Sequence, residues 1–194
     1  MSSEFLIWRY RSVRGAAVLH DLRGFDENNR FEHGRTLKDE FPAETAFHMD
    51  PDFPRDLTLP DNVCNAEQVL LVSQRLQQAL IDSGLTHAEY LPMTVIDHKG
   101  RVASASHVIV HPLELVDCID MQQSVYQPHR LVKGKIDKVT KLVLDAQRVP
   151  PDRQLFKLKG YPTPVIVRRA FAEQLNQASF SGLDWLDVAD FPST

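Results

Sequence analysis

The sequence is poor in cysteine and glycine and has no long apolar run, and each shortage excludes a class of protein. Cys64 and Cys118 lie outside any C-x-x-C pair, so we expect two reduced, buried thiols rather than a disulfide framework. Eight glycines leave little material for a phosphate-binding loop. No stretch approaches the roughly 18 apolar residues of a membrane helix, and the apolar run 5–7 is too short for a signal peptide. We therefore expect a cytoplasmic protein without a membrane partner.

What is present is typical of a soluble, folded domain. The chain has 194 residues, of which 43% are hydrophobic and 25% are charged, and this length allows one core to fold without disulfides. The formal net charge of −4 argues against direct binding of nucleic acid, because a surface that binds phosphates is basic. We expect one domain over residues 1–194, and the sequence does not indicate its oligomeric state.

The acidity is concentrated in residues 24–65, where ten carboxylates oppose four cations. Prolines interrupt this segment, so we expect residues 1–65 to form a divergent and irregular N-terminal part. The segment is either a solvated loop or an electrostatic docking face for a basic partner such as a nuclease toxin. In the second case we expect the partner-binding residues to be Glu32, Asp39, Glu40, Glu44, Asp50, Asp52, Phe53 and Asp56.

Large apolar side chains are interleaved with these carboxylates. They are Phe25, Phe31, Phe41, Phe47, Met49 and Phe53. Side chains of this kind could anchor a partner, as the centre of an interface requires, or they could tie the segment down onto the core. The sequence leaves both possibilities open.

Residues 66–190 have the regular pattern of an α+β core. Apolar spacings of three and four predict a helix over residues 73–83, ended by Gly84. Extended segments at 90–96 and 101–111 lie on either side of the polar turn 97–100, and residues 90–96 and 103–111 form a predicted hairpin. Residues 124–130 are predicted to be a loop. Further strands are predicted at 5–10, 139–144, 155–158 and 165–167.

An internal similarity relates residues 71–93 to residues 166–188 at a constant offset of 95 and without gaps. Each copy reads as strand, amphipathic helix, turn and aromatic-led strand, which predicts a second helix over residues 168–178. Chance similarity of two such patterns is the alternative to a duplication, and we favour the duplication. We predict a single α+β domain with a mostly antiparallel sheet and two main helices from the duplicated unit. The matching pairs include Leu76 with Phe171, Leu80 with Leu175, and Tyr90 with Trp185.

Signatures of hydrolases, nucleotide-binding proteins and zinc proteases are missing, so we expect no catalytic residue, metal or cofactor. His107 and His111 have the spacing of metal ligands on a helix, but the residues between them favour a strand, where the two lie about 13 Å apart. Asp117 and Asp120 could act as a general acid and base, or cap backbone donors in a turn, and we favour the turn. Cys118 has no neighbouring motif typical of a nucleophile.

Several short motifs, taken together, resemble those of immunity protein family eleven of bacterial polymorphic toxin systems. The resemblance covers about residues 67–188, whereas residues 1–65 match only loosely. It implies a small protein that binds and blocks a toxin encoded beside it, and it supplies no catalytic residues. The matching residues are 71–80, Gly84-Leu85, Glu89-Tyr90-Leu91-Pro92, 97–100, His111-Pro112-Leu113, Val116-Asp117-Cys118-Ile119-Asp120 with Ser124, 151–158 with their LFKL core, the second predicted helix at 168–178, and 182–186.

We therefore predict a protein without enzymatic activity that neutralises a cognate bacterial toxin by stoichiometric complex formation. Two alternatives stay open. The first is a protein-interaction or signalling module of the bacterial cytoplasm whose partner is not a toxin. The second is an enzyme that uses Asp117, Asp120 and a central histidine, which requires these side chains to converge in one pocket.

Overall fold

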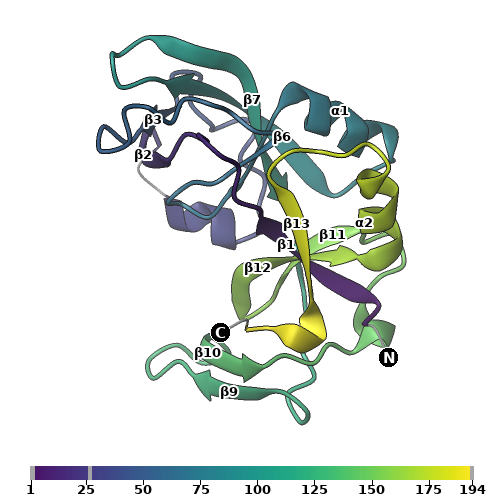
Figure 1. The fold of residues 1–194 in the computed structure, drawn as a ribbon. Helices are drawn as coiled ribbons and strands as arrows, with labels where there is room; N and C mark the ends of the chain where they lie inside the picture. The colour runs from purple at the N-terminus through teal and green to yellow at the C-terminus, as the bar shows by residue number, and fades with distance from the viewer. Residues whose placement is uncertain (1–2, 26–27, 193–194) are drawn as a thin grey trace.

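Two β-sheets, a separate β-hairpin and two short helices form the α+β fold (Figure 1). The computed structural model describes residues 3–25 and 28–192 and contains 40% strand and 14% helix. The six-stranded sheet has the order β2 (Leu19–Arg23), β3 (Ala46–Met49), β6 (Ala88–Ile96), β7 (Val102–Pro112), β5 (Leu70–Val72) and β4 (Asn62–Val63). The five-stranded sheet has the order β13 (Leu183–Asp187), β1 (Phe5–Tyr10), β12 (Tyr161–Arg168), β11 (Leu155–Leu158) and β8 (Leu115–Val116).

The remaining elements are short. The hairpin consists of β9 (Val125–Pro128) and β10 (Ile136–Lys141), and the helices are α1 (Gln74–Asp82) and α2 (Arg169–Asn176). Single 3-10 turns lie at η1 (Asn28–Glu32), η2 (Ala146–Arg148) and η3 (Val188–Asp190). Most strand pairs are antiparallel, but β3 with β6 and β11 with β8 are parallel. Both large sheets are therefore mixed rather than purely antiparallel.

Both helices were predicted close to their observed positions. The Ser73 hydroxyl accepts a hydrogen bond from the Leu76 amide and so caps the start of α1. Gly84, with a φ of 73°, ends the same helix in the left-handed conformation that glycine adopts at little cost. Leu76 and Leu80 on α1 and Phe171 and Leu175 on α2 are all buried. Each such side chain contributes about 1.5–3 kcal/mol when it is fully removed from water.

The two predicted strand–helix–strand units correspond in hydrogen-bond register. In the first unit β5 and β6 lie on either side of β7, and Leu71 and Leu91 both pair with Ile109. In the second unit β12 and β13 lie on either side of β1, and Ile166 and Leu186 both pair with Ile7. These positions are related by the offset of 95 found in the sequence. Descent of both units from one ancestor stays a prediction.

The same offset relates residues with unusual backbone conformations. Gly84 corresponds to Ser179 and His87 to Gly182, and all four have positive φ angles. Positive φ is uncommon outside glycine, so its recurrence at matched positions shows that the two helix-to-strand connections follow the same path. The correspondence therefore extends from the strands into the turns.

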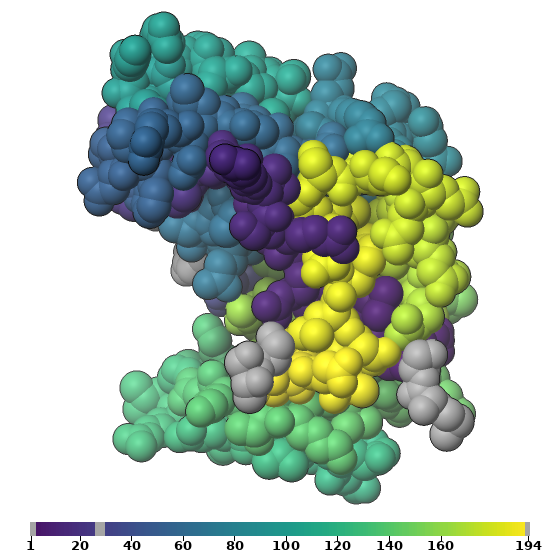
Figure 2. Space-filling model, viewed as in Figure 1, coloured from purple at the N-terminus to yellow at the C-terminus, as the bar shows by residue number. Residues whose placement is uncertain are grey.

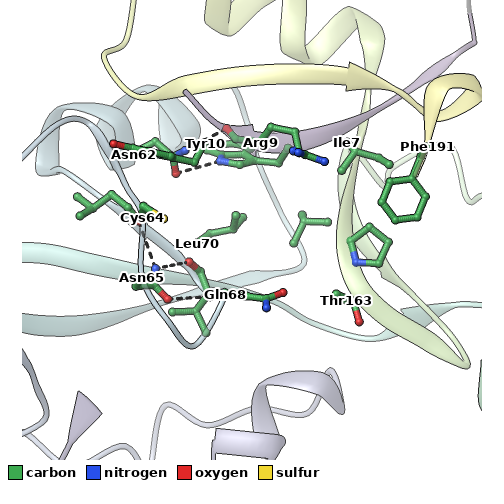
Figure 3. A pocket seen from close by; sticks show the side chains of 15 residues that line it. Ile7, Arg9, Tyr10, Asn62, Cys64, Asn65, Gln68, Leu70, Thr163 and Phe191 are labelled. Carbon is green, nitrogen blue, oxygen red and sulfur yellow. Dashed lines mark hydrogen bonds between the residues drawn. The ribbon is translucent and has the colours of Figure 1, made fainter. Parts of the chain in front are cut away.

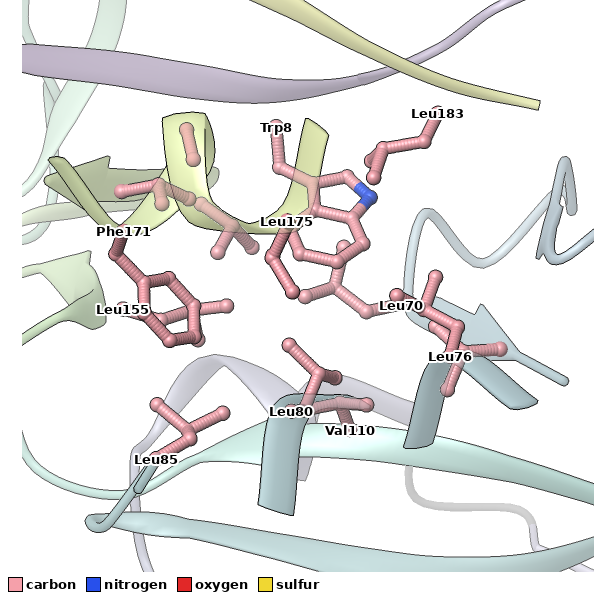
Figure 4. Close-up of a cluster of buried hydrophobic side chains, with 14 of the residues drawn as sticks. Trp8, Leu70, Leu76, Leu80, Leu85, Val110, Leu155, Phe171, Leu175 and Leu183 are labelled. Atoms are coloured by element: carbon pink, nitrogen blue, oxygen red, sulfur yellow. The ribbon is translucent and has the colours of Figure 1, made fainter. Parts of the chain in front are cut away.

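Alternating side chains divide the apolar residues of each sheet between an inner and an outer face. The inner faces of both sheets and both helices share one cluster, which includes Trp8, Leu80, Val110 and Leu175 (Figure 4). Trp8 belongs to this cluster and Trp185 packs against it. The two rings meet edge to face, with centroids 5.2 Å apart. The outer face of each sheet is covered by a different part of the chain.

Residues before β5 cover the outer face of the six-stranded sheet. Here Leu71, Leu91 and Ile109 pack with aromatic residues of the acidic segment. Five of the six interleaved side chains are buried or partly buried in this cluster, so they tie the segment to the core: Phe25, Phe31, Phe41, Phe47 and Met49. Phe53 alone of the six is 45% exposed.

Residues 116–149 cover the outer face of the five-stranded sheet, and here the sequence prediction was partly wrong. Residues 124–130, predicted as a loop, contain β9, and the strand predicted at 139–144 is β10, shifted toward the N-terminus. Only Ile136 and Val139 of β10 are buried, because irregularities in the ladder with β9 break the simple alternation. The periodicity that identifies a strand in sequence is therefore lost.

Two further predictions concern the N-terminal part and the cysteines. The acidic segment is largely irregular, yet β3 within it is an internal strand between β2 and β6. Its carboxylates Asp26 and Glu27 lie outside the described residues. Cys118 is buried as expected, but Cys64 is exposed, which corrects the expectation for that thiol.

Candidate partner-binding surfaces

The eight residues expected to bind a partner lie in two groups at opposite ends of β3. Glu32, Asp39, Glu40 and Glu44 precede the strand, and Asp50, Asp52, Phe53 and Asp56 follow it. Glu44 and Asp50 are six positions apart, which corresponds to roughly 20 Å along an extended chain. Strand β3 thus separates the eight residues into two groups of four, and whether either group binds a partner stays a prediction.

The group before β3 is built on a cluster of three aromatic rings. Phe25 packs against Phe31 and Phe41 with ring centroids 5.1 and 5.2 Å apart. Arg30 lies beside the Phe25 ring and forms an ion pair with Glu40. Glu32 lies 3.5 Å from the Nζ atom of Lys135. Because two of its four carboxylates already face cations, this group presents less negative charge than the sequence suggests.

The group after β3 combines carboxylates with exposed apolar side chains. The Asp50 carboxylate accepts a hydrogen bond from the Asp52 amide at 2.9 Å, which holds the turn that displays Phe53. Phe53 is 45% exposed and Leu57 is 52% exposed. An aromatic side chain ringed by charge is the usual composition of an interface anchor. This group, which we call the Phe53 surface, comprises Asp50, Asp52, Phe53, Asp56 and Leu57.

Two adjoining cavities lie where strands β1 and β12 of the five-stranded sheet separate. The ladder between β1 and β12 ends at Ile7 and Ile166, and beyond that pair the strands separate. A cavity of about 290 Å³ occupies this opening and is lined by Trp8, Tyr10 and Val165, among others (Figure 3). A second cavity of about 400 Å³ shares Gln68 and Thr163 with the first. The surface is visibly hollowed on this side of the molecule (Figure 2).

Polar side chains around the first cavity are occupied by the protein itself. The indole N–H of Trp8 donates to Asn62 Oδ1 at 3.0 Å, and Asn62 Nδ2 donates to the Gly182 carbonyl at 2.9 Å. Asn65 Nδ2 donates to the Val69 carbonyl at 2.8 Å (Figure 3). These bonds fix the connection between β4 and β5. They indicate a structural role for the amides that line this cavity.

Lys157 is the one lysine of the described chain whose side chain is buried, and it borders the second cavity. Its Nζ atom donates to the Phe31 carbonyl at 2.9 Å, and burial lowers the pKa of Lys157 to about 8, with the Glu32 carboxylate opposing that change. Nearby, His111 Nε2 donates to the Arg35 carbonyl at 2.9 Å. Lys157 on β11 and His111 on β7 thus hold η1 and the turn that follows it against both sheets.

The candidate catalytic residues are engaged in local structure. Asp120 Oδ1 accepts hydrogen bonds from the Gln122 and Gln123 amides, as the turn interpretation predicts. Asp117 instead forms ion pairs with Arg148 and Lys159 at 2.9 and 3.3 Å, rather than capping a turn. No hydrogen bond within residues 3–25 and 28–192 joins either aspartate to a histidine. In the part of the chain that the structure describes, the hydrogen bonds and ion pairs of these two carboxylates therefore involve no histidine.

The central histidines and Cys118 also have local partners or surroundings. His107 and His111 lie on strand β7 as predicted, and both are buried. His107 Nδ1 is 2.8 Å from the Ser104 hydroxyl, and burial lowers the pKa of both imidazoles. Burial also raises the pKa of the Cys118 thiol to about 12, so it stays protonated at neutral pH. Within the described part of the chain, no group of three or more His, Cys, Asp or Glu side chains could hold a metal ion.

The sequence analysis missed one exposed surface, the β9–β10 hairpin. Leu131 at its tip is 90% exposed, and Val132 beside it is 49% exposed. The signal was present as five cations within residues 125–141, but the segment was interpreted partly as loop. Because it is both charged and apolar, this hairpin is a second candidate for partner binding.

Comparison with known proteins adds one match. A sequence model described as the immunity protein family (Imm11) matches residues 10–190, which include the six-stranded sheet, the five-stranded sheet apart from most of β1, the acidic segment and the hairpin. No curated protein matches the chain. The helices of the described ranges are too short and too polar to cross a membrane, since α1 has nine residues and α2 has eight.

Proposed function

The chain belongs to the immunity protein family Imm11, and from this premise we propose that it neutralises a cognate bacterial toxin by forming a stoichiometric complex with it. Family membership indicates toxin neutralisation in general. The match over residues 10–190 is the observation that carries the proposal, because it takes in nearly every element of the fold. We place the complex in the bacterial cytoplasm.

Binding rather than catalysis is the mechanism that the site geometry supports. A reaction would depend on side chains such as two carboxylates or a thiol. Asp117 is held in an ion pair, Asp120 in a turn, and Cys118 in the core. The surfaces that combine exposed apolar side chains with charged ones lie elsewhere, on the Phe53 surface and on the hairpin. A protein that works through such surfaces recognises a macromolecule.

The Phe53 surface suits a basic toxin, such as a nuclease. Its carboxylates would attract a positively charged partner and speed association, while Phe53 and Leu57 would supply apolar contact once the surfaces meet. Arg55 lies within this segment, and the ring of His98, the neighbour of Lys99, donates a hydrogen bond to the Pro54 carbonyl at 3.0 Å, so cations border the carboxylates in a mixed pattern that a partner must match in orientation. Electrostatic complementarity of this kind contributes more to specificity and association rate than to affinity.

The first experiment tests toxin neutralisation itself. The full-length protein is mixed with the purified product of the toxin gene adjacent to its own, and the mixture is analysed by size-exclusion chromatography with light scattering. We expect one species that contains both chains in equimolar amounts, and we expect co-expression to restore growth of cells that produce the toxin. Separate elution of the two proteins together with unrelieved toxicity would contradict the proposal.

The second experiment tests the Phe53 surface. We expect Phe53→Ala to raise the Kd for that toxin about tenfold, which corresponds to about 1.4 kcal/mol of binding free energy. Ile81→Ala is the matched control, because Ile81 has the same 45% exposure but lies on α1. Asp52→Lys is expected to slow association at low salt, whereas Glu173→Lys, at an exposed position on α2, is not. If all four variants bind like the wild type, the toxin contacts another surface.

A further inference from the structure

The β9–β10 hairpin has a charge opposite to that of the chain as a whole. Residues 125–141 contain five cations and one carboxylate, a net charge of +4, whereas the whole chain has a formal charge of −4. The cations are Arg130, Lys133, Lys135, Lys138 and Lys141, and the carboxylate is Asp137. All six residues are exposed or partly exposed. The hairpin is therefore a local basic surface on an acidic protein.

Apolar side chains are exposed among these cations. Leu131 is 90% exposed, Val125 is 56% exposed and Val132 is 49% exposed. Single exposed apolar residues are ordinary on protein surfaces, but three on one hairpin of 17 residues, flanked by Arg130 and Lys133, are typical of an interaction site. Leu131 has the highest exposure of the large hydrophobic residues in the described ranges.

The tip that displays Leu131 is held in one conformation. His129 Nδ1 accepts hydrogen bonds from the amides of both Leu131 and Val132 at 3.0 Å. The His129 amide donates to the Lys135 carbonyl at 2.9 Å, which closes the loop between the strands. A rigid loop loses less conformational entropy when it binds, so this arrangement favours affinity.

The base of the hairpin is fixed to the body of the protein. Ile136 and Val139 are buried against the outer face of the five-stranded sheet. The Ile136 amide donates to the Gly160 carbonyl at 2.8 Å, and a Cβ atom at Gly160 would lie 2.4 Å from the Gly134 carbonyl oxygen. The close approach requires glycine at residue 160, and it sets the angle at which the tip projects.

The tip borders the hollow between the two halves of the molecule (Figure 2). Lys135 on the tip faces Glu32 of η1 at 3.5 Å, so the basic hairpin and the acidic N-terminal part meet there. The second cavity, lined by Glu32, Glu67 and Lys157, lies beside this contact. A partner that enters the hollow would meet walls of opposite charge.

We propose that the β9–β10 hairpin is a second contact surface for the toxin, on which Leu131 enters an apolar socket that carboxylates of the toxin surround. This inference rests on the proposed function and adds to it the chemistry of a second region of the partner. The toxin then presents a basic area to the Phe53 surface and an acidic area to the hairpin. Two contacts of opposite sign fix the orientation of the complex.

A protein partner accounts for the hairpin better than nucleic acid or a membrane does. Phosphates offer no apolar contact to the exposed side chains of the hairpin, Leu131, Val125 and Val132. The carboxylates of Glu32 and Glu67 nearby would repel a phosphate backbone. A single myristoyl chain already gives only marginal membrane binding, and the two tip side chains Leu131 and Val132 bury less apolar area than that. An apolar socket on a protein surface matches both the size of the tip and its charged rim.

The experiment compares variants of the full-length protein in binding kinetics with the purified product of the adjacent toxin gene. We expect Leu131→Asn to raise the Kd about tenfold, mainly through faster dissociation. Lys133→Glu should lower the association rate about threefold or more at low salt, and the difference should shrink at high salt. Ile81→Asn and Arg14→Glu are the matched controls, because each makes the same kind of change on another exposed surface.

The outcomes separate this inference from the proposed function. If the wild type does not bind the toxin, both fail. If the wild type binds and both hairpin variants bind equally well, only the hairpin assignment is overturned. Vesicles containing phosphatidylserine and a short DNA duplex are tested in parallel with the wild type. The wild type could bind the vesicles or the DNA, and Leu131→Asn or Lys133→Glu could abolish that binding without any change in toxin binding. This result would assign the hairpin to lipid or nucleic acid and would also overturn the proposal.

Discussion

The two strand–helix–strand units are alike in backbone geometry but opposite in the charge of the segments that cover them. Both place equivalent strands on either side of a central antiparallel strand in the same register. Residues 24–65, with four cations and ten carboxylates, cover the outer face of the first unit. The hairpin at residues 125–141, with its net charge of +4, belongs to the cover of the second.

This difference separates the scaffold from the surfaces that we propose to act. The shared cluster between the units needs apolar side chains of the right size at matched positions, and charge plays no part in it. The two covering segments pack onto the sheets through a few apolar residues, and their other residues can vary. Substitutions in these segments can therefore change which partner is bound without changing the register of the strands.

The largest expected effect tests whether the matched core positions are energetically equivalent. Leu80 and Leu175 are related by the offset of 95, and their exposures are 0% and 2%. We expect Leu80→Ala and Leu175→Ala each to lower the free energy of unfolding by about 2–5 kcal/mol, since both leave a cavity in the same cluster. Urea denaturation monitored by tryptophan fluorescence measures both values.

Ile81→Ala is the control for the core comparison, because Ile81 is exposed on the same helix and should change stability by less than about 0.5 kcal/mol. If one of the two substitutions lowered the free energy of unfolding strongly and the other hardly at all, one unit would contribute most of the stability of the shared cluster. The likeness of the two units would then be one of backbone shape alone.

The second prediction concerns the place where the two halves meet. Lys157 extends from β11 of the second sheet to the Phe31 carbonyl of the segment that covers the first, and burial lowers its pKa from 10.5 to about 8. Below pH 8 the folded protein must hold a buried ammonium group, which is unfavourable. As the pH rises from 8 to 10.5, the folded state loses that proton before the unfolded state does, so the free energy of unfolding increases.

The variant Lys157→Met removes this titration. The difference in unfolding free energy between the wild type and Lys157→Met should therefore rise by up to about 3 kcal/mol between pH 8 and pH 10.5. Lys138→Met makes the same substitution at an exposed position on β10 and is the matched control. A difference that stays constant with pH for Lys157→Met would mean that water solvates this lysine and that the two sheets are joined less tightly.

Much of the scaffold could be predicted from the sequence because its pattern is local. The spacing of Leu76 and Leu80, and Gly84 after them, identified α1, and β1 lies at the residues 5–10 predicted for it. The offset between residues 71–93 and 166–188 anticipated the shared register. The parallel pairing of β3 with β6 could not be foreseen, because the periodicity around β3 is weak and the two strands are far apart in sequence.

The surfaces were harder to predict because exposure is a property of the fold. Phe47 and Phe53 stand in the same acidic segment, yet the first is buried and the second is 45% exposed. Nothing in the residue type distinguishes them. In the same way, the sequence around Leu131 does not indicate that this side chain is exposed. The hydrogen bond from the Leu131 amide to the His129 ring, which holds the loop at the tip, is seen only in the structure. Only the tertiary contacts decide which apolar side chains are left for a partner.

The smallest expected effect tests the turns of the two units by exchanging their residues. Gly84 and Ser179 are equivalent and have φ angles of 73° and 50°, so a serine pays a backbone cost in the second unit that the glycine avoids in the first. A Cβ atom at Gly84 meets no other atom within 4 Å, so Gly84→Ser should lose about 1 kcal/mol from the backbone conformation alone. Ser179→Gly should gain about 0.5 kcal/mol, since the flexibility of glycine in the unfolded chain offsets part of the relief. Thermal unfolding of both single variants and of the double exchange measures these changes, and a loss of stability in Ser179→Gly would show that the second turn depends on contacts of the serine side chain that the first turn lacks.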